Sequence, residues 1–224
     1  MRRMLWTLYC AAFLWAFSCS ASAAGIKEIV VALESTPPHF NPALLSGSTV
    51  ATVGVQLYAG LTRVDAAGNA VPYLAKSWET SPDGLSVRFE LRENAFFHDG
   101  HPITSDDVAY SILMSREYHP FRPMLESVTR VDTPSPHTVI VRLSRPFPLL
   151  PKVLVPALVP ILPRHVFDDR HPFPTHPANR EAVGSGPFML ESFTPDRSIR
   201  LVRNPLFFLP DRPVVDRLTF RIFW

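Results

Sequence analysis

One short segment of this chain carries side chains that could bind a metal. His98-Asp99-Gly100-His101 brings His and Asp, both zinc-ligand types, within four residues. Its spacing lacks the i,i+4 separation of a helical metal site and fixes no third ligand, whereas Asp-Gly is a strong turn signal. The segment therefore predicts a tight turn and no metal. A site built from scattered histidines is the alternative, and the histidines available for it are His165, His171 and His176.

Two other groups could carry out catalysis but lack the required pattern. Gly184-Ser185-Gly186 is not the Gly-x-Ser-x-Gly nucleophile elbow, because position 183 is Val. Asp106 and Asp107 resemble a carboxylate pair, but they follow Thr104 as the acids of a first helical turn, where they stabilise the helix N-terminus. We predict that the protein is not an enzyme. A secreted metal-dependent hydrolase is the distant alternative.

Strand and helix patterns surround these residues. An alternating strand at 87–92 buries Val87, Phe89 and Leu91, and a capped helix begins at Thr104 with a buried stripe that includes Leu113. Prolines between Pro146 and Pro187 predict an irregular, buried stretch. The fold class is mixed α/β, with further strands expected at 27–33, 61–64, 128–132, 137–143, 199–203 and 215–223 and a helix at 48–58.

The first residues have the pattern of a secretory signal peptide. Arg2 and Arg3 precede an apolar run from 4 to 17, and Ala21-Ser22-Ala23 offers small residues for cleavage after Ala23. The run is short for an uncleaved membrane anchor, which is the rival interpretation. We therefore expect a signal peptide at 1–23 and a periplasmic location. Both cysteines, Cys10 and Cys19, lie inside that segment, so the exported chain would have no disulfide.

Charge and composition limit the classes of partner. The chain has 22 Lys and Arg against 20 Asp and Glu. Without Arg2 and Arg3 the two signs balance, which argues against nucleic acid or an anionic membrane as a partner. No feature of the sequence calls for a cofactor, and we expect a monomer.

Eight short motifs follow one another in a fixed order. The chain resembles family 5 of the bacterial extracellular solute-binding proteins, the peptide- and nickel-binding proteins of ABC importers. In the Tyr58–Arg63 motif Ala59 replaces the family's usual acid. The eight motifs are Asn41-Pro42, Tyr58–Arg63, Pro72–Glu79, Phe97–Pro102, Thr138–Leu143, Gly184–Phe188, Arg203-Asn204-Pro205 and Asp216–Ile222.

The resemblance implies a type II-like periplasmic binding protein in which two lobes close on a ligand by hinge motion. On this mapping, residues 24–45 and 180–224 form part of the first lobe, and residues 46–179 form a domain inserted into it. The second lobe would begin after Trp224 and is missing from this sequence.

The resemblance also implies a function. We expect the periplasmic substrate-binding component of an ABC importer, which captures peptides and delivers them to the importer's permease and ATPase without chemistry. The alternatives are a truncated remnant that binds nothing, or a binder of nickel, haem or another solute. The candidate ligand-binding residues lie in two segments, namely Glu34, Ser35, Thr36, His39 and Phe40 in the first and Gly184, Ser185, Gly186 and Phe188 in the second.

Overall fold

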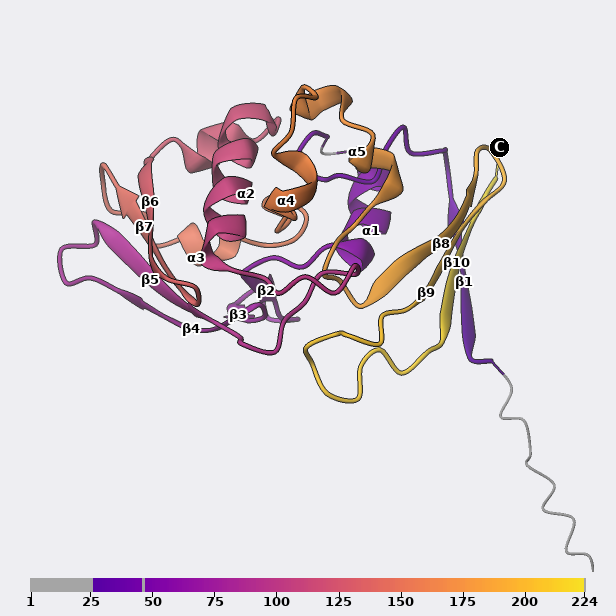
Figure 1. Cartoon of the computed structure of the whole chain (residues 1–224), viewed down its shortest axis with the longest axis horizontal. Coiled ribbons are helices and arrows are strands. Elements are labelled where there is room, and N and C mark those ends of the chain that lie inside the picture. The colour runs from indigo at the N-terminus through magenta and orange to yellow at the C-terminus, as the bar shows by residue number, and fades with distance from the viewer. Residues whose placement is uncertain (1–25, 46, 224) are drawn as a thin grey trace, which may run out of the picture.

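The computed structural model describes residues 26–45 and 47–223 of the chain. The predicted signal peptide, with Cys10 and Cys19, lies outside these residues. In the described part, no helix is long and apolar enough to cross a membrane. The predicted mixed α/β class is confirmed, because two four-stranded sheets, a two-stranded ribbon and several helices make up the molecule (Figure 1).

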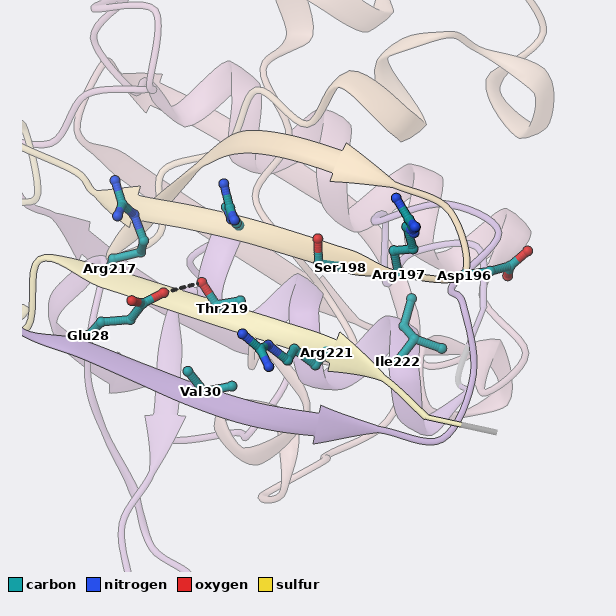
Figure 2. A pocket seen from close by; sticks show the side chains of 10 residues that line it. Glu28, Val30, Asp196, Arg197, Ser198, Arg217, Thr219, Arg221 and Ile222 are labelled. Atoms are coloured by element: carbon teal, nitrogen blue, oxygen red, sulfur yellow. Dashed lines mark hydrogen bonds between the residues drawn. The ribbon is translucent and has the colours of Figure 1, made fainter.

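The first sheet joins the two ends of the chain, at the right of Figure 1. Its order is β1-β10-β9-β8, in which β1 runs parallel to β10 and the other neighbours are antiparallel. Alternation along β10 turns Leu218 and Phe220 inward and leaves Arg217 and Arg221 on the outer face (Figure 2), and Ile222 at the end of the strand is also buried. The strands are β1 (Glu28–Leu33), β8 (Phe188–Thr194), β9 (Ser198–Arg203) and β10 (Arg217–Ile222).

The second sheet is antiparallel throughout and has the order β4-β5-β7-β6. In β5, Val87, Phe89 and Leu91 are buried, so the predicted half-buried strand is confirmed. These strands lie beside the short β2–β3 ribbon. Their bounds are β2 (Thr62–Val64), β3 (Ala70–Pro72), β4 (Ala75–Thr80), β5 (Ser86–Leu91), β6 (Val128–Ser135) and β7 (Thr138–Leu143).

Helix α2 (Ser105–Tyr118) lies against β6 and β7. Its predicted capping box is confirmed, because the Asp107 carboxylate accepts the Thr104 backbone N–H at 2.9 Å. The prediction that Leu113 is buried is wrong, since 42% of it is exposed. Leu113 lies about 100° around the helix from the buried Ile112. A buried Ser111 completes the inner face instead, and its hydroxyl accepts the Leu162 N–H at 2.8 Å.

The remaining helices are short, apart from α1. The proline-rich stretch forms turns and single helical turns that bury apolar side chains, as its composition predicts. Helix α1 lies against β8 of the first sheet. The helices are α1 (Ser48–Leu57), α3 (Leu150–Val153), α4 (Arg164–Phe167) and α5 (Ala178–Glu181), with 3-10 turns at Arg122–Leu125 and Phe173–Thr175.

Two hydrophobic cores divide the chain close to Tyr58. Val53, Leu57 and Tyr58 pack with the first sheet, whereas Ala59 and Leu61 pack with the second. Helix α1 therefore shares a core with the first-lobe segments, although the domain boundary at residue 46 assigns it to the inserted domain. The boundaries at 46 and 179 stay a prediction.

A close backbone crossing joins the two cores. Gly184-Ser185-Gly186 passes over the last turn of α1, and the Gly186 N–H donates to the Leu57 carbonyl at 2.9 Å. A Cβ atom on Gly184 would overlap the Leu57 carbonyl, and one on Gly186 would overlap that of Gln56. We call this crossing, together with His98, the glycine junction.

His98 fixes the glycine junction from the side of the second sheet. Its backbone N–H donates to the Gly184 carbonyl at 2.8 Å, and its ring Nδ1 accepts the Gly184 N–H at 3.1 Å. The ring proton therefore resides on Nε2, which faces the Gly186 carbonyl at 3.4 Å. Burial lowers the pKa of His98 to about 4. A second proton on Nδ1 would break the hydrogen bond to Gly184.

A methyl group at Gly184 tests how tightly the junction is packed. We expect Gly184→Ala to lower the free energy of unfolding by about 2–3 kcal/mol, because the backbone of α1 must move. Gly47→Ala is the matched control, since its Cβ would meet only the Leu45 side chain, at 3.8 Å. Urea denaturation followed by circular dichroism measures both variants. Equal stability of the two variants would contradict the close crossing.

The neutral state of His98 predicts loss of stability in acid. Because its folded pKa of about 4 lies below the ordinary value of 6.5, the unfolded chain takes up the proton first as the pH falls. The contribution of neutral His98 to the free energy of unfolding is complete above pH 6.5 and is lost between pH 6.5 and 4. Between pH 7 and pH 5 the native protein should lose about 2 kcal/mol more than His98→Asn, which keeps an acceptor but does not titrate. Identical pH profiles in urea denaturation would refute this role.

Candidate ligand-binding site

The loop Glu34–Phe40 leaves the sheet at the carboxyl end of β1. Because β1 and β10 are parallel, both strands end at this edge, and the Phe223 N–H donates to the Leu33 carbonyl at 3.0 Å. Ligands of open sheets bind outside the carboxyl ends of parallel strands. Among the described residues β1 and β10 form the one parallel pair, so this edge is the candidate place for a ligand.

Two carboxylates face this edge. The Glu34 carboxylate accepts a hydrogen bond from the Ser48 hydroxyl in the first turn of α1, at 2.8 Å. The Thr36 hydroxyl donates to the Asp196 carboxylate at 2.6 Å and accepts the Asp196 N–H at 2.9 Å. Glu34 and Asp196 are exposed, and neither forms an ion pair within the described part of the chain. Together with the half-buried Ser35, they form an acidic edge.

His39 lies further along the same loop. Burial, followed by the nearby positive charge of Arg180, lowers the pKa of its half-buried ring. Ring atom Nδ1 is buried and has no hydrogen-bond partner in the described ranges. The Arg180 guanidinium donates to the Pro38 carbonyl at 2.9 Å, which ties the loop to α5. His39 is therefore a neutral polar group held at a fixed place in the loop.

A polar groove of about 500 Å³ runs along the outer face of the first sheet, from Glu28 to Asp196 (Figure 2). Thr219 donates to Glu28 at 2.6 Å across β1 and β10. Arg200 lies opposite Thr219, and this places it diagonally between the two outward arginines of β10. The groove reaches the acidic edge at Asp196. It is lined by Glu28, Val30, Asp196, Arg197, Ser198, Arg200, Arg217, Thr219, Arg221 and Ile222.

The other candidate residues lie inside the protein. Phe40 is fully buried and meets Phe193 edge to face, with ring centroids 5.1 Å apart. Gly184 and Gly186 are buried at the glycine junction, and Ser185 has a buried hydroxyl without a partner among the residues described. Phe188 is buried beside a second, more apolar groove of about 640 Å³ that also contacts Tyr73 and Phe207.

The structure thus separates the two candidate segments. Glu34 adjoins the first turn of α1 at Ser48, whereas Gly186 adjoins its last turn at Leu57. The two places are one helix length apart, or about 15 Å. Glu34, Ser35, Thr36 and His39 share one edge, and the glycines and Phe188 lie at the other end of the sheet. A ligand-binding role for either group stays a prediction.

Sequence reasoning missed two parts of this site. Asp196 lies in the turn between β8 and β9 with φ of 59°, and Pro195-Asp196 is a turn signal that could have placed it at a sheet edge. The arginines of the outer face alternate along strands that the sequence did indicate. Neither signal shows that the turn lies beside Thr36, because the two segments are 160 residues apart.

Comparison with known proteins identifies the fold. The model of the bacterial extracellular solute-binding proteins, family 5 middle region, matches residues 69–223. Di/tripeptide-binding protein 1 of Pseudomonas aeruginosa is 26% identical over 229 residues, covering 88% of this chain and 41% of that protein. A Brucella ovis protein provisionally designated an ABC transporter peptide-binding protein is 33% identical over 164 residues, covering 69% of this chain and 30% of its own length.

Solved structures agree with this identification. NikZ of Campylobacter jejuni, in complex with Ni(L-His), superposes with a TM-score of 0.79 at 26% identity and covers 88% of this chain and 39% of its own. The oligopeptide-binding protein AppA of Bacillus subtilis, in complex with a nonapeptide, gives 0.79 at 25% identity, with 88% and 40% covered. The fold is that of part of a type II periplasmic binding protein.

The chain spans about two fifths of the length of most of these relatives. The family match includes six of the eight sequence motifs and extends over more than half of the chain. The resemblance found in the sequence is therefore confirmed. The chain belongs to family 5 of the bacterial extracellular solute-binding proteins.

Proposed function

We propose that this chain is part of the substrate-binding component of an ABC importer, that it captures peptides and that it acts in the periplasm. Family membership supports capture and delivery without chemistry, because the relatives compared above are named for what they bind. The partners in this proposal are a peptide or other small solute and the importer's permease and ATPase in the inner membrane. The protein acts as a monomer.

The acidic edge at the carboxyl end of β1 carries this proposal. A peptide differs from most small solutes in offering an α-ammonium group next to a chain of amide groups. Two exposed carboxylates, Glu34 and Asp196, have no cationic partner among the described residues and suit that ammonium group. Thr36 holds Asp196 in place, and Ser48 holds Glu34. The two carboxylates are therefore already oriented before a ligand binds, which lowers the conformational entropy lost on binding.

The charged groove behind the edge fits a longer ligand. Its guanidinium groups follow one another along the outer face of the sheet, and Arg217 pairs with Glu191 at 3.3 Å. A peptide bound by its amino end at Glu34 would extend along this face toward Arg221 and Arg200, where a carboxylate terminus would meet positive charge. The groove accordingly favours a zwitterionic peptide over a neutral solute.

Removing the charge of Glu34 tests the proposal. Isothermal titration of the purified chain with a tripeptide pool should give binding that Glu34→Gln weakens about tenfold or more, the effect of losing a charge-assisted hydrogen bond. Glu79→Gln is the matched control, because Glu79 is an exposed carboxylate on β4 of the other sheet. It should bind as the unchanged chain does.

Titration with an N-acetylated tripeptide tests whether Glu34 binds the ammonium group of the peptide. Because acetylation removes the ammonium group, it should lower the affinity of the unchanged chain about as much as Glu34→Gln lowers its affinity for the free tripeptide. The two changes together should lower the affinity little further. Additive losses would place the ammonium elsewhere. Absence of binding to any peptide would contradict peptide capture and favour a chain that binds another solute or nothing.

A further inference from the structure

Two clusters of histidine and aspartate form in the tertiary structure outside the proposed peptide site. One consists of Asp99, His101 and His165, and the other of Asp169, His171 and His176. In each cluster the potential ligand atoms lie within 4.8 Å of one another. Hydrogen bonds distinguish the two clusters, because an imidazole nitrogen binds a metal only when it carries no proton.

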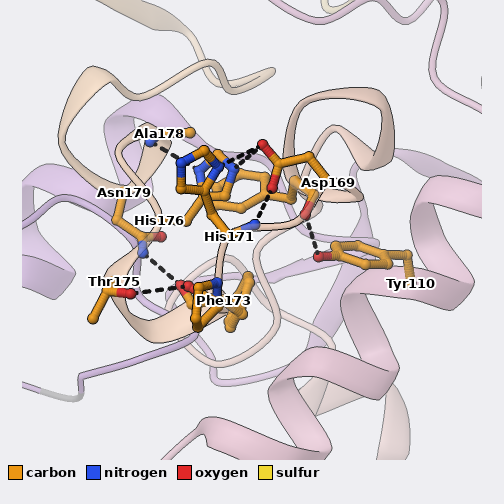
Figure 3. A network of polar contacts seen from close by, with 10 residues as sticks. Tyr110, Asp169, His171, Phe173, Thr175, His176, Ala178 and Asn179 are labelled. Atoms are coloured by element: carbon orange, nitrogen blue, oxygen red, sulfur yellow. Dashed lines mark hydrogen bonds and ion pairs between the residues drawn. The ribbon is translucent and has the colours of Figure 1, made fainter.

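In the cluster at Asp169, hydrogen bonds fix the protons of the rings in positions that disfavour a metal (Figure 3). His176 accepts the Ala178 N–H at ring atom Nδ1, at 3.1 Å, so the proton of the neutral ring resides on Nε2. That nitrogen is the one that faces Asp169, at 3.3 Å. A metal there would force the proton onto Nδ1, against the Ala178 N–H. His171 binds both oxygens of the same carboxylate through its backbone and ring.

The cluster at Asp99 lacks this obstacle. His165 Nε2 lies 2.7 Å from Asp99 Oδ2, and His101 Nδ1 lies 3.3 Å from Asp99 Oδ1. The outer nitrogens of both rings have no hydrogen-bond partner within residues 26–45 and 47–223. Each ring can therefore place its proton outward and present a lone pair toward Asp99. The two rings lie 4.0 Å apart and are tilted by 31°.

Separate elements bring these three ligands together. Asp99 and His101 flank Gly100, whose φ of 88° makes the tight turn. His165 belongs to α4, where the Arg164 N–H is held by the Asp107 carboxylate at 2.9 Å. Phe97 supports the His165 ring edge to face, with centroids 5.8 Å apart. The ligands are thus positioned by a turn and a helix 66 residues apart in sequence.

We propose that Asp99, His101 and His165 bind one divalent zinc-like cation, with water as the fourth ligand. Ligand atoms about 2.0–2.2 Å from tetrahedral zinc lie about 3.3–3.6 Å from one another. The two observed separations from Asp99 lie within about 1 Å of that spacing, so small side-chain shifts admit the ion. The bound cation links α4 to the turn whose neighbour His98 holds the glycine junction. Its effect is to stabilise the contact between the two cores.

Zinc titration of the untagged protein, stripped with a chelator, tests this site. Isothermal titration calorimetry with ZnCl2 at pH 7.5 should show one ion per chain, and thermal denaturation should show a rise in Tm that grows with zinc concentration. His165→Asn should weaken zinc binding at least tenfold. His171→Asn is the matched control in the other cluster and should leave the affinity unchanged. Affinity should fall at pH 5.5, because protons compete for the imidazoles.

His101→Asn provides a second variant if His165→Asn does not fold, since His101 is largely exposed and its loss leaves α4 intact. It should also weaken zinc binding at least tenfold. Equal losses in the His101 and His171 variants would overturn the assignment, as would the absence of zinc binding at 100 µM. Peptide binding does not enter either measurement, so the outcome is independent of the proposed function.

Discussion

The close crossing of Gly184–Gly186 over the last turn of α1 is the constraint on which the rest of this structure depends. Two backbone segments approach so closely that any Cβ on either glycine would overlap a carbonyl of Gln56 or Leu57. The crossing leads the chain from α5 into β8 of the first sheet. His98 closes the crossing with its neutral ring. Two further hydrogen bonds, from the Leu162 N–H to Ser111 and from the Arg164 N–H to Asp107, also connect the two cores through α2.

Helix α1 transmits this constraint to the proposed ligand site. Its last turn is held at the glycine junction, and its first turn holds Glu34 through Ser48. The helix is therefore a spacer of about 15 Å between the junction and the acidic edge. A ligand at the edge and a change at the junction act on the same rigid element. The groove on the outer face of the sheet is lined mainly by charged and polar side chains.

Local patterns decided much of the fold. The alternation of Val87, Phe89 and Leu91 predicted β5, and Thr104 with Asp107 predicted the start of α2. Leu113 shows where such patterns fail. The buried face of α2 includes Ser111, whose hydroxyl accepts the Leu162 N–H, and Leu113 lies outside that face. A polar residue on a buried face cannot be recognised without its partner. The first candidate segment also contains residues of two kinds that its sequence does not distinguish. Glu34 to His39 lie on the edge of the sheet, and Phe40 is a core residue.

The sequence by itself determined the fold class, the family and the order of the elements, because periodicity, turn residues and ordered motifs are local properties of the chain. Only the tertiary structure decided which distant residues meet. Thr36 finds Asp196 across 160 positions, and Asp99 finds His165 across 66. The sheet register and the packing of α4 set these contacts. The two glycines at 184 and 186 read equally well as a turn or a ligand contact until the backbone of α1 was placed against them.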